Sequence, residues 1–513
     1  MAHQTDKNNK SNTLSTYLFE LFVFGCLGAL SLNAAHASAP KTKVTPAQYF
    51  ANLKADAPAP GALAAQSPLA TSVSKSGRSP AEVAAADEST MTPQLIALRD
   101  SVLKANTPEQ IDELLNKLDS EYESYPSSFK FVAAQFLVLK PMRGFFWRIL
   151  PLVEKNTMLH SMILSFAKTA AAQIKVYYPN GQWEAGWAYL SEPYVKNGKV
   201  IGQIATEEAL QAFLANTVYR NLRKATERLE ALDLTQSMTW DNKIFYGSAS
   251  YEDKIDRYRL VGEVERLMTI SSFHSNLAQL AFQRAYSLQG VVDLYADLGK
   301  LYGFDGIFTG NVSGAPASER TAVVRAAKFA SLGTLLPDGD SFTKLSLQHL
   351  QKSAYYASEA WDALQSRPVS ETYVINSGPY LAAPRIQKIR ISNLKAMLEG
   401  PAQIRSAATG EIAEVNLTAF YETPPKDLKD LLATGFDGGS KWAVKDLTLG
   451  DGKSTQVKFR NFYEGRPDQW NVSALQPYFP KVSSSDDVRR TARILDEAYG
   501  GSEAALPLAF IVR

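Results

Sequence analysis

The spacing of apolar residues changes along this chain, and that change constrains the fold more than any other feature. Over residues 206–232 apolar side chains recur every three or four positions, which is typical of an amphipathic helix. Similar stripes predict helices over 251–269, 276–301, 319–332 and 341–366. After Pro368, short runs rich in Val, Ile, Thr and aromatic residues alternate as half-buried strands do. We therefore expect a mainly α-helical region, a helical bundle or an α-solenoid-like array, followed by a smaller α+β domain with antiparallel strands.

Short turn and cap signals refine this expectation. Thr92-Pro93 and Thr107-Pro108 are typical helix starts, in which threonine caps the helix and proline takes its first position. Hairpin turns are expected at 197–198, 409–410 and 450–453. Strands are predicted over 371–376, 385–391, 414–420, 441–449, 455–463 and 505–512, with helical pieces at 425–434 and 485–499.

The N-terminus has the layout of a secretory signal. An apolar run from Leu21 to Leu32 precedes Ala35-His36-Ala37, so residues 1–37 are predicted to be a signal peptide cleaved after Ala37. A membrane anchor is the weaker alternative because the run falls short of the roughly 20 residues needed to span a bilayer. A lipoprotein signal at Cys26 is a third interpretation, disfavoured because the apolar run continues past that residue.

Domain limits and location follow from composition. Residues 38–91 are rich in Ala, Pro and Ser and predict a flexible linker, followed by an α-helical domain over 92–367 and an α+β domain over 368–513. Cys26 is the single cysteine, so the mature chain would have no thiol and no disulfide. That absence favours a bacterial envelope, which predicts a periplasmic or secreted protein without a transmembrane anchor.

Residues 129–178 form the most hydrophobic block of the mature chain. Pro141 and Pro151 interrupt it, so it offers no continuous membrane span. A buried helical hairpin is the preferred interpretation. The alternative is an interfacial membrane segment, in which Phe145 and Phe146 would lie beside arginines at the bilayer surface.

Several chemistries are disfavoured. A net charge of +2 gives no reason to expect a nucleic-acid partner. His160, His274 and His349 lie on separate predicted helices without cysteine partners, so no metal site and no cofactor are predicted. We expect His160 in the core or at its boundary, and His274, at a predicted helix junction, to be the most exposed of the three.

Two short segments combine aromatic rings with acidic side chains, as sugar or peptide sites do. The candidate binding residues are Trp183, Glu184, Trp187 and Tyr189 in the first segment, and Trp240 and Asp241 in the second. The alternative is that these rings anchor their segments to the helical core, because large aromatic side chains dominate core packing.

Two classes of function fit this sequence. The favoured one is an exported bacterial cell-envelope protein that acts without catalysis, as a binding or scaffold protein for a protein or glycan partner. The alternative is a carboxylate-based envelope hydrolase that acts on cell-wall glycan. The scarcity of histidine and the lack of thiols and catalytic motifs favour the first class.

Overall fold

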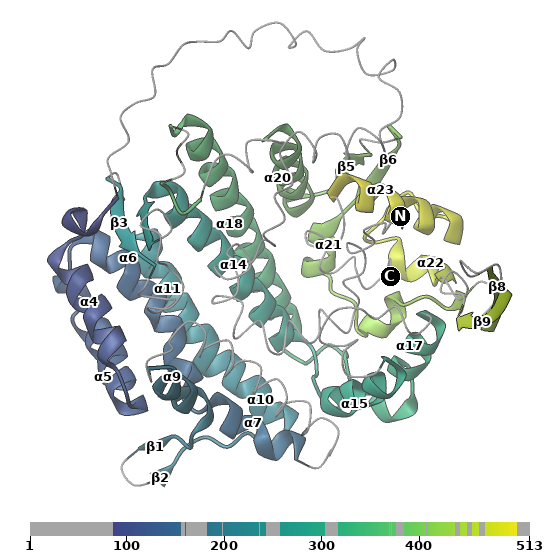
Figure 1. Ribbon diagram of the computed structural model, residues 1–513. Coiled ribbons are helices and arrows are strands. Elements are labelled where there is room, and N and C mark those ends of the chain that lie inside the picture. The colour runs from purple at the N-terminus through teal and green to yellow at the C-terminus, as the bar shows by residue number, and fades with distance from the viewer. Residues whose placement is uncertain are drawn as a thin grey trace, which may run out of the picture.

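The structure is a computed structural model of the 513-residue chain (Figure 1). It describes residues 86–154, 160, 182–196, 199–234, 236–242, 257–302, 317–368, 370, 372–375, 384–406, 409–436, 442–448, 454–460 and 467–499. The predicted signal peptide, nearly all of the predicted linker and the predicted strand 505–512 lie outside the described residues.

Helices make up most of the described chain, which confirms the predicted fold class. The helices are α4 (Pro93–Lys104), α5 (Pro108–Ser120), α6 (Ser127–Phe136), α7 (Phe145–Val153), α9 (Gln182–Ser191), α10 (Glu207–Phe213), α11 (Tyr219–Glu230), α14 (Glu263–Ala285), α15 (Val291–Tyr302), α17 (Ala317–Val324), α18 (Gly339–Ser366), α20 (Pro384–Glu399), α21 (Leu417–Glu422), α22 (Val472–Leu475) and α23 (Ser485–Tyr499). None of these described helices has the length and apolar character needed to cross a membrane.

Within the described residues, the strands form separate antiparallel pairs. The pairs are β1 (Val195–Lys196) with β2 (Lys199–Val200), β3 (Met238–Asp241) with β4 (Tyr258–Val261), β5 (Ala402–Arg405) with β6 (Ile412–Val415), β7 (Gly435–Phe436) with β10 (Pro467–Gln469), and β8 (Trp442–Thr448) with β9 (Ser454–Arg460). The strands that flank each of the three predicted hairpin turns therefore pair as expected, although residues 197–198 and 450–453 themselves lie outside the described residues.

The first and largest core gathers apolar side chains from α4 through α17. Both predicted caps are present: Thr92 accepts from the Leu95 amide and Thr107 from the Gln110 amide. Phe145 and Phe146 are buried in this core, so the described part of 129–178 packs inside the protein, as the buried-hairpin interpretation expects.

The two longest helices, α14 and α18, lie side by side in the middle of the molecule (Figure 1). Hydrogen bonds between them include Ser346 Oγ to the Ala278 carbonyl (2.8 Å) and Ser271 Oγ to the Ser353 carbonyl (2.8 Å). Small side chains let the helices approach closely enough for such contacts. This pair connects the first core to the second, which lies around β5, β6, α21 and α23.

Helix limits differ from the prediction in the middle of the chain. Residues 258–261 form β4 and not a helix, and α14 begins at Glu263, where Glu265 accepts a hydrogen bond from the Gly262 amide at 2.9 Å. Helix α14 then continues through residues 271–275, where a junction was expected. The predicted helix 206–232 is three consecutive segments, because Leu214–Val218 adopts a π-helical turn between α10 and α11.

Three predicted strands are wrong. In the described part of 371–376, Tyr373 makes only an isolated bridge to Leu260. Residues 385–391 belong to α20, and only the first part of 414–420 is a strand, because Asn416 accepts from the Ala419 amide and begins α21. Isoleucines at 389 and 391 alternate as in a strand, whereas those at 386 and 389 have the spacing of a helix, and periodicity alone does not separate the two in so short a run. Further along α20, Met397 and Leu398 are buried in the second core, which anchors the helix there.

Candidate functional site

The first predicted aromatic and acidic segment forms helix α9. Trp187 is half-buried and packs on Phe146, with ring centroids 5.5 Å apart. Tyr189 is buried, and its hydroxyl donates to the Leu139 carbonyl at 3.2 Å. The side chains of Trp183 and Glu184 lie outside the described residues. The two described rings thus pack against the helical core, and a ligand at this segment stays a prediction.

The second segment lies on β3, and both of its predicted residues are buried. Trp240 belongs to the first core. Asp241 is fully buried and pairs with Arg99 Nη1 at 3.3 Å and Arg257 Nη2 at 2.9 Å. The Asp241 carboxylate therefore forms ion pairs that join helix α4 to the β3–β4 strand pair. Ligand binding by Trp240 and Asp241 also stays a prediction.

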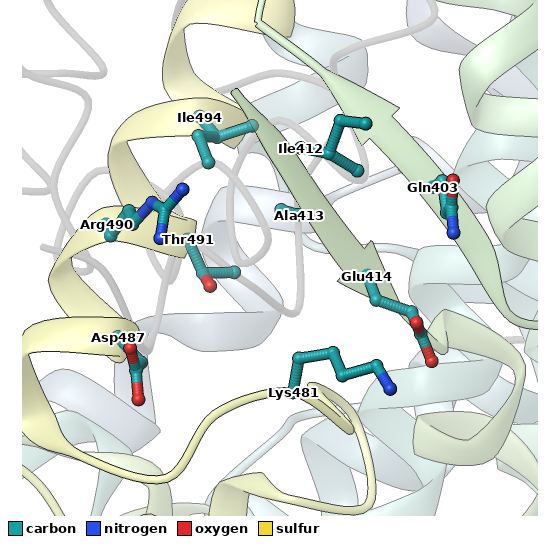
Figure 2. A pocket seen from close by; sticks show the side chains of 9 residues that line it. All are labelled: Gln403, Ile412, Ala413, Glu414, Lys481, Asp487, Arg490, Thr491 and Ile494. Atoms are coloured by element: carbon teal, nitrogen blue, oxygen red, sulfur yellow. The ribbon is translucent and has the colours of Figure 1, made fainter. Parts of the chain in front are cut away.

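A pocket opens between the β5–β6 hairpin and the N-terminal half of α23 (Figure 2). Its volume is about 250 Å³. The lining residues are Gln403, Ile412, Ala413, Glu414, Lys481, Asp487, Arg490, Thr491 and Ile494.

Strand pairing and helix geometry bring these side chains together. Gln403 lies opposite Glu414 in the antiparallel register, so both project from the same face of the hairpin. The alternate residues of the two strands, Ile404 and Ala413, are buried in the second core. Helix α23 packs on β5 and β6 through its apolar side, which leaves polar side chains at its edge to face the pocket.

Two of the charged lining residues are held by neighbours. Asp487 accepts from the backbone amide and hydroxyl of Ser483 and from the Ser484 hydroxyl, at 2.8–3.0 Å. These hydrogen bonds lower the pKa of Asp487 to about 2. Arg490 Nε donates to Glu411 at 2.9 Å. These two charges are therefore partly satisfied before any ligand binds.

The other two charges lack such partners. Within the described part of the chain, neither Lys481 nor Glu414 forms a salt bridge. Figure 2 shows the Lys481 side chain directed towards the Glu414 carboxylate, with Thr491 on the facing helix. The pocket therefore offers a cation, an anion and a hydroxyl to one small polar group. No motif in the sequence singled out these residues; the alternation of 402–405 and 412–415 was the available signal.

The expectation that His274 is exposed is wrong. His274 lies in the middle of α14 and is only 2% exposed, because the helix does not break at 271–275. Its Nδ1 lies 3.0 Å from Nδ1 of His349 on α18. Among the described residues, no group of three or more His, Cys, Asp and Glu side chains is arranged to hold a metal ion.

Comparisons with known proteins give this chain no relative: it matches no protein-family model, no curated protein and no solved structure.

Proposed function

We propose that this chain is an exported bacterial cell-envelope protein that binds a protein or glycan partner without catalysis, and that the pocket at the β5–β6 hairpin receives one residue or one sugar of that partner. The observation that carries the proposal is that Lys481, Glu414 and Thr491 line one pocket of about 250 Å³, with the Lys481 side chain directed towards the Glu414 carboxylate. Export rests on the apolar run before Ala35-His36-Ala37.

The size of the pocket supports a small group of a larger partner. Pockets for whole drug-sized ligands usually measure about 300–1,000 Å³, so this one fits a single residue or sugar ring. The partly exposed Ile412 adds an apolar contact at the rim. Because solvent-exposed ion pairs contribute only about 0–1 kcal/mol each, the partner would have to make further contacts outside the pocket.

Asp487 is unsuited to be the acid of a glycoside hydrolase. A glycoside hydrolase needs one carboxyl group that stays protonated near neutral pH so that it can donate a proton. The pKa of Asp487 is lowered to about 2, so this carboxyl is ionised at neutral pH and cannot fill that role.

Charge reversal tests the proposal. The exported chain, beginning at residue 38, would be mixed with purified cell-wall sacculi and separately with their soluble glycan and peptide fragments, and bound protein would be measured by co-sedimentation and calorimetry. Lys481→Glu should weaken binding by about tenfold, since a contact replaced by repulsion costs of order 1 kcal/mol or more. The double variant Lys481→Glu with Glu414→Lys should recover part of the affinity.

The matched control is Lys344→Glu, which reverses an exposed charge on α18. If Lys481→Glu binds as tightly as the wild type, or if Lys344→Glu weakens binding equally, the pocket is not the binding site. Release of soluble fragments from the sacculi would show hydrolysis and contradict a non-catalytic role.

A further inference from the structure

Four side chains form a hydrogen-bonded chain through the packed helices α11, α14 and α18, and we call it the imidazole chain. Glu230 Oε1 lies 3.0 Å from Nε2 of His274, whose Nδ1 lies 3.0 Å from Nδ1 of His349. His349 Nε2 lies 2.9 Å from the Tyr219 hydroxyl. Glu230 and Tyr219 are the last and first residues of α11, so the imidazole chain joins both ends of that helix to the central helix pair.

The contact between the two Nδ1 atoms limits how many protons the histidines hold. One nitrogen must donate and the other accept, so a single hydrogen lies between them. With both rings neutral, His274 donates to the Glu230 carboxylate and accepts from His349, which accepts from Tyr219. With one added proton, His274 donates on both sides, and His349 accepts from it and donates to Tyr219.

A second added proton has no such arrangement. It would put N–H against N–H at 3.0 Å, between two positive rings that are both buried. A buried like-charge pair without a bridging hydrogen is strongly unfavourable. The three contacts of the imidazole chain therefore survive the first proton and not the second.

Neighbouring charges favour this one-proton limit. Hydrogen bonds, first from His274 and then from Lys352 and Tyr356, hold the pKa of Glu230 at about 2, so a carboxylate faces His274. Burial, followed by the charge of His274, lowers the pKa of His349 to about 4. The charged and titratable groups that face the pair are Tyr219, Arg223 and Glu230 from α11 and Lys352 and Tyr356 from α18, while α14 contributes His274.

We infer that the imidazole chain is a proton-binding site that accepts one added proton, and that a second proton separates His274 from His349 and loosens α18 from α11 and α14. The inference is independent of ligand binding at the β5–β6 hairpin. In an exported protein such a site would respond to acid outside the cell.

The sign of the pH dependence follows from the lowered pKa of His349. His349 takes up a proton near pH 6.5 in the unfolded chain and only near pH 4 in the folded chain. Its contribution to folding stability is therefore fully present above pH 6.5 and is lost as the pH falls from 6.5 to 4. Through this group alone, the folding equilibrium constant should fall on the order of a hundredfold across that interval. Glu230 acts in the same direction at lower pH, because its folded pKa is also lowered.

Nitrogen NMR of the imidazole rings tests the proton count directly. In ¹⁵N-histidine-labelled protein at pH 7 to 5, we expect one nitrogen of the His274–His349 contact to carry a proton and the other to be unprotonated. Two doubly protonated rings in the folded protein at pH 5 would overturn the inference.

A variant pair tests the consequence for stability. His349→Asn replaces the ring with an amide that does not titrate, and His160→Asn is the matched control, since it removes a half-buried histidine that is not one of the four residues. In urea unfolding from pH 7.5 to 4, His349→Asn should be less stable at pH 7.5 but lose much less of its folding constant on acidification than the wild type or the control. Parallel pH curves for all three proteins would contradict the proposed site, and if His349→Asn does not fold, the NMR result decides.

Discussion

At the scale of single residues, Asp241 carries a buried charge, and substituting it distinguishes a structural role from a binding role. Its carboxylate accepts from Arg99 and Arg257 and has no exposure to solvent. Asp241→Asn leaves two arginines without their shared anion, so it should lower the free energy of unfolding by about 3–5 kcal/mol, the usual cost of breaking a buried pair. Asp486→Asn, which breaks an exposed pair on α23, should change it by no more than about 1 kcal/mol. Chemical denaturation measures both; loss of ligand binding in Asp241→Asn at unchanged stability would instead favour the predicted binding role.

At the scale of elements, the start of α18 is fixed by its close approach to the end of α14. A Cβ atom on Gly339 would lie 2.4 Å from the Ala285 carbonyl oxygen and 2.6 Å from Leu335 Cδ1. Helix propensity alone predicts that alanine is favoured over glycine by about 1 kcal/mol. The contact reverses that sign, and Gly339→Ala should destabilise the protein by about 1–3 kcal/mol. Thermal unfolding checks the sign, with Asp340→Ala as the neighbouring control; a stabilised Gly339→Ala variant would contradict this packing.

Elements with strong local signals were predictable from the sequence, and contacts between distant elements were not. Thr92 and Thr107 cap helices because their hydrogen bonds are made within three residues. The His274–His349 contact joins residues 75 positions apart and depends on the register of α14 against α18, which no local pattern encodes. The pocket at the β5–β6 hairpin likewise needs α23 beside strands about 80 residues earlier, so its lining residues carried no local signal.

At the scale of the whole molecule, α18 belongs to both cores. Leu347 and Ala354 pack in the second core, whereas Tyr356 packs against the first. Arg367, at the predicted domain limit, pairs with Glu265 of α14 at 2.9 Å. Because both cores share α18, opening either core exposes apolar surface of the other. We therefore expect the described region to unfold in a single calorimetric transition, with equal van't Hoff and calorimetric enthalpies. Two resolved transitions would instead favour the division at residue 367 predicted from the sequence. A core variant distinguishes one transition from two. If the molecule is cooperative, Phe420→Ala in the second core should lower the temperature of the whole transition, because the first core cannot keep α18 in place once the second has opened.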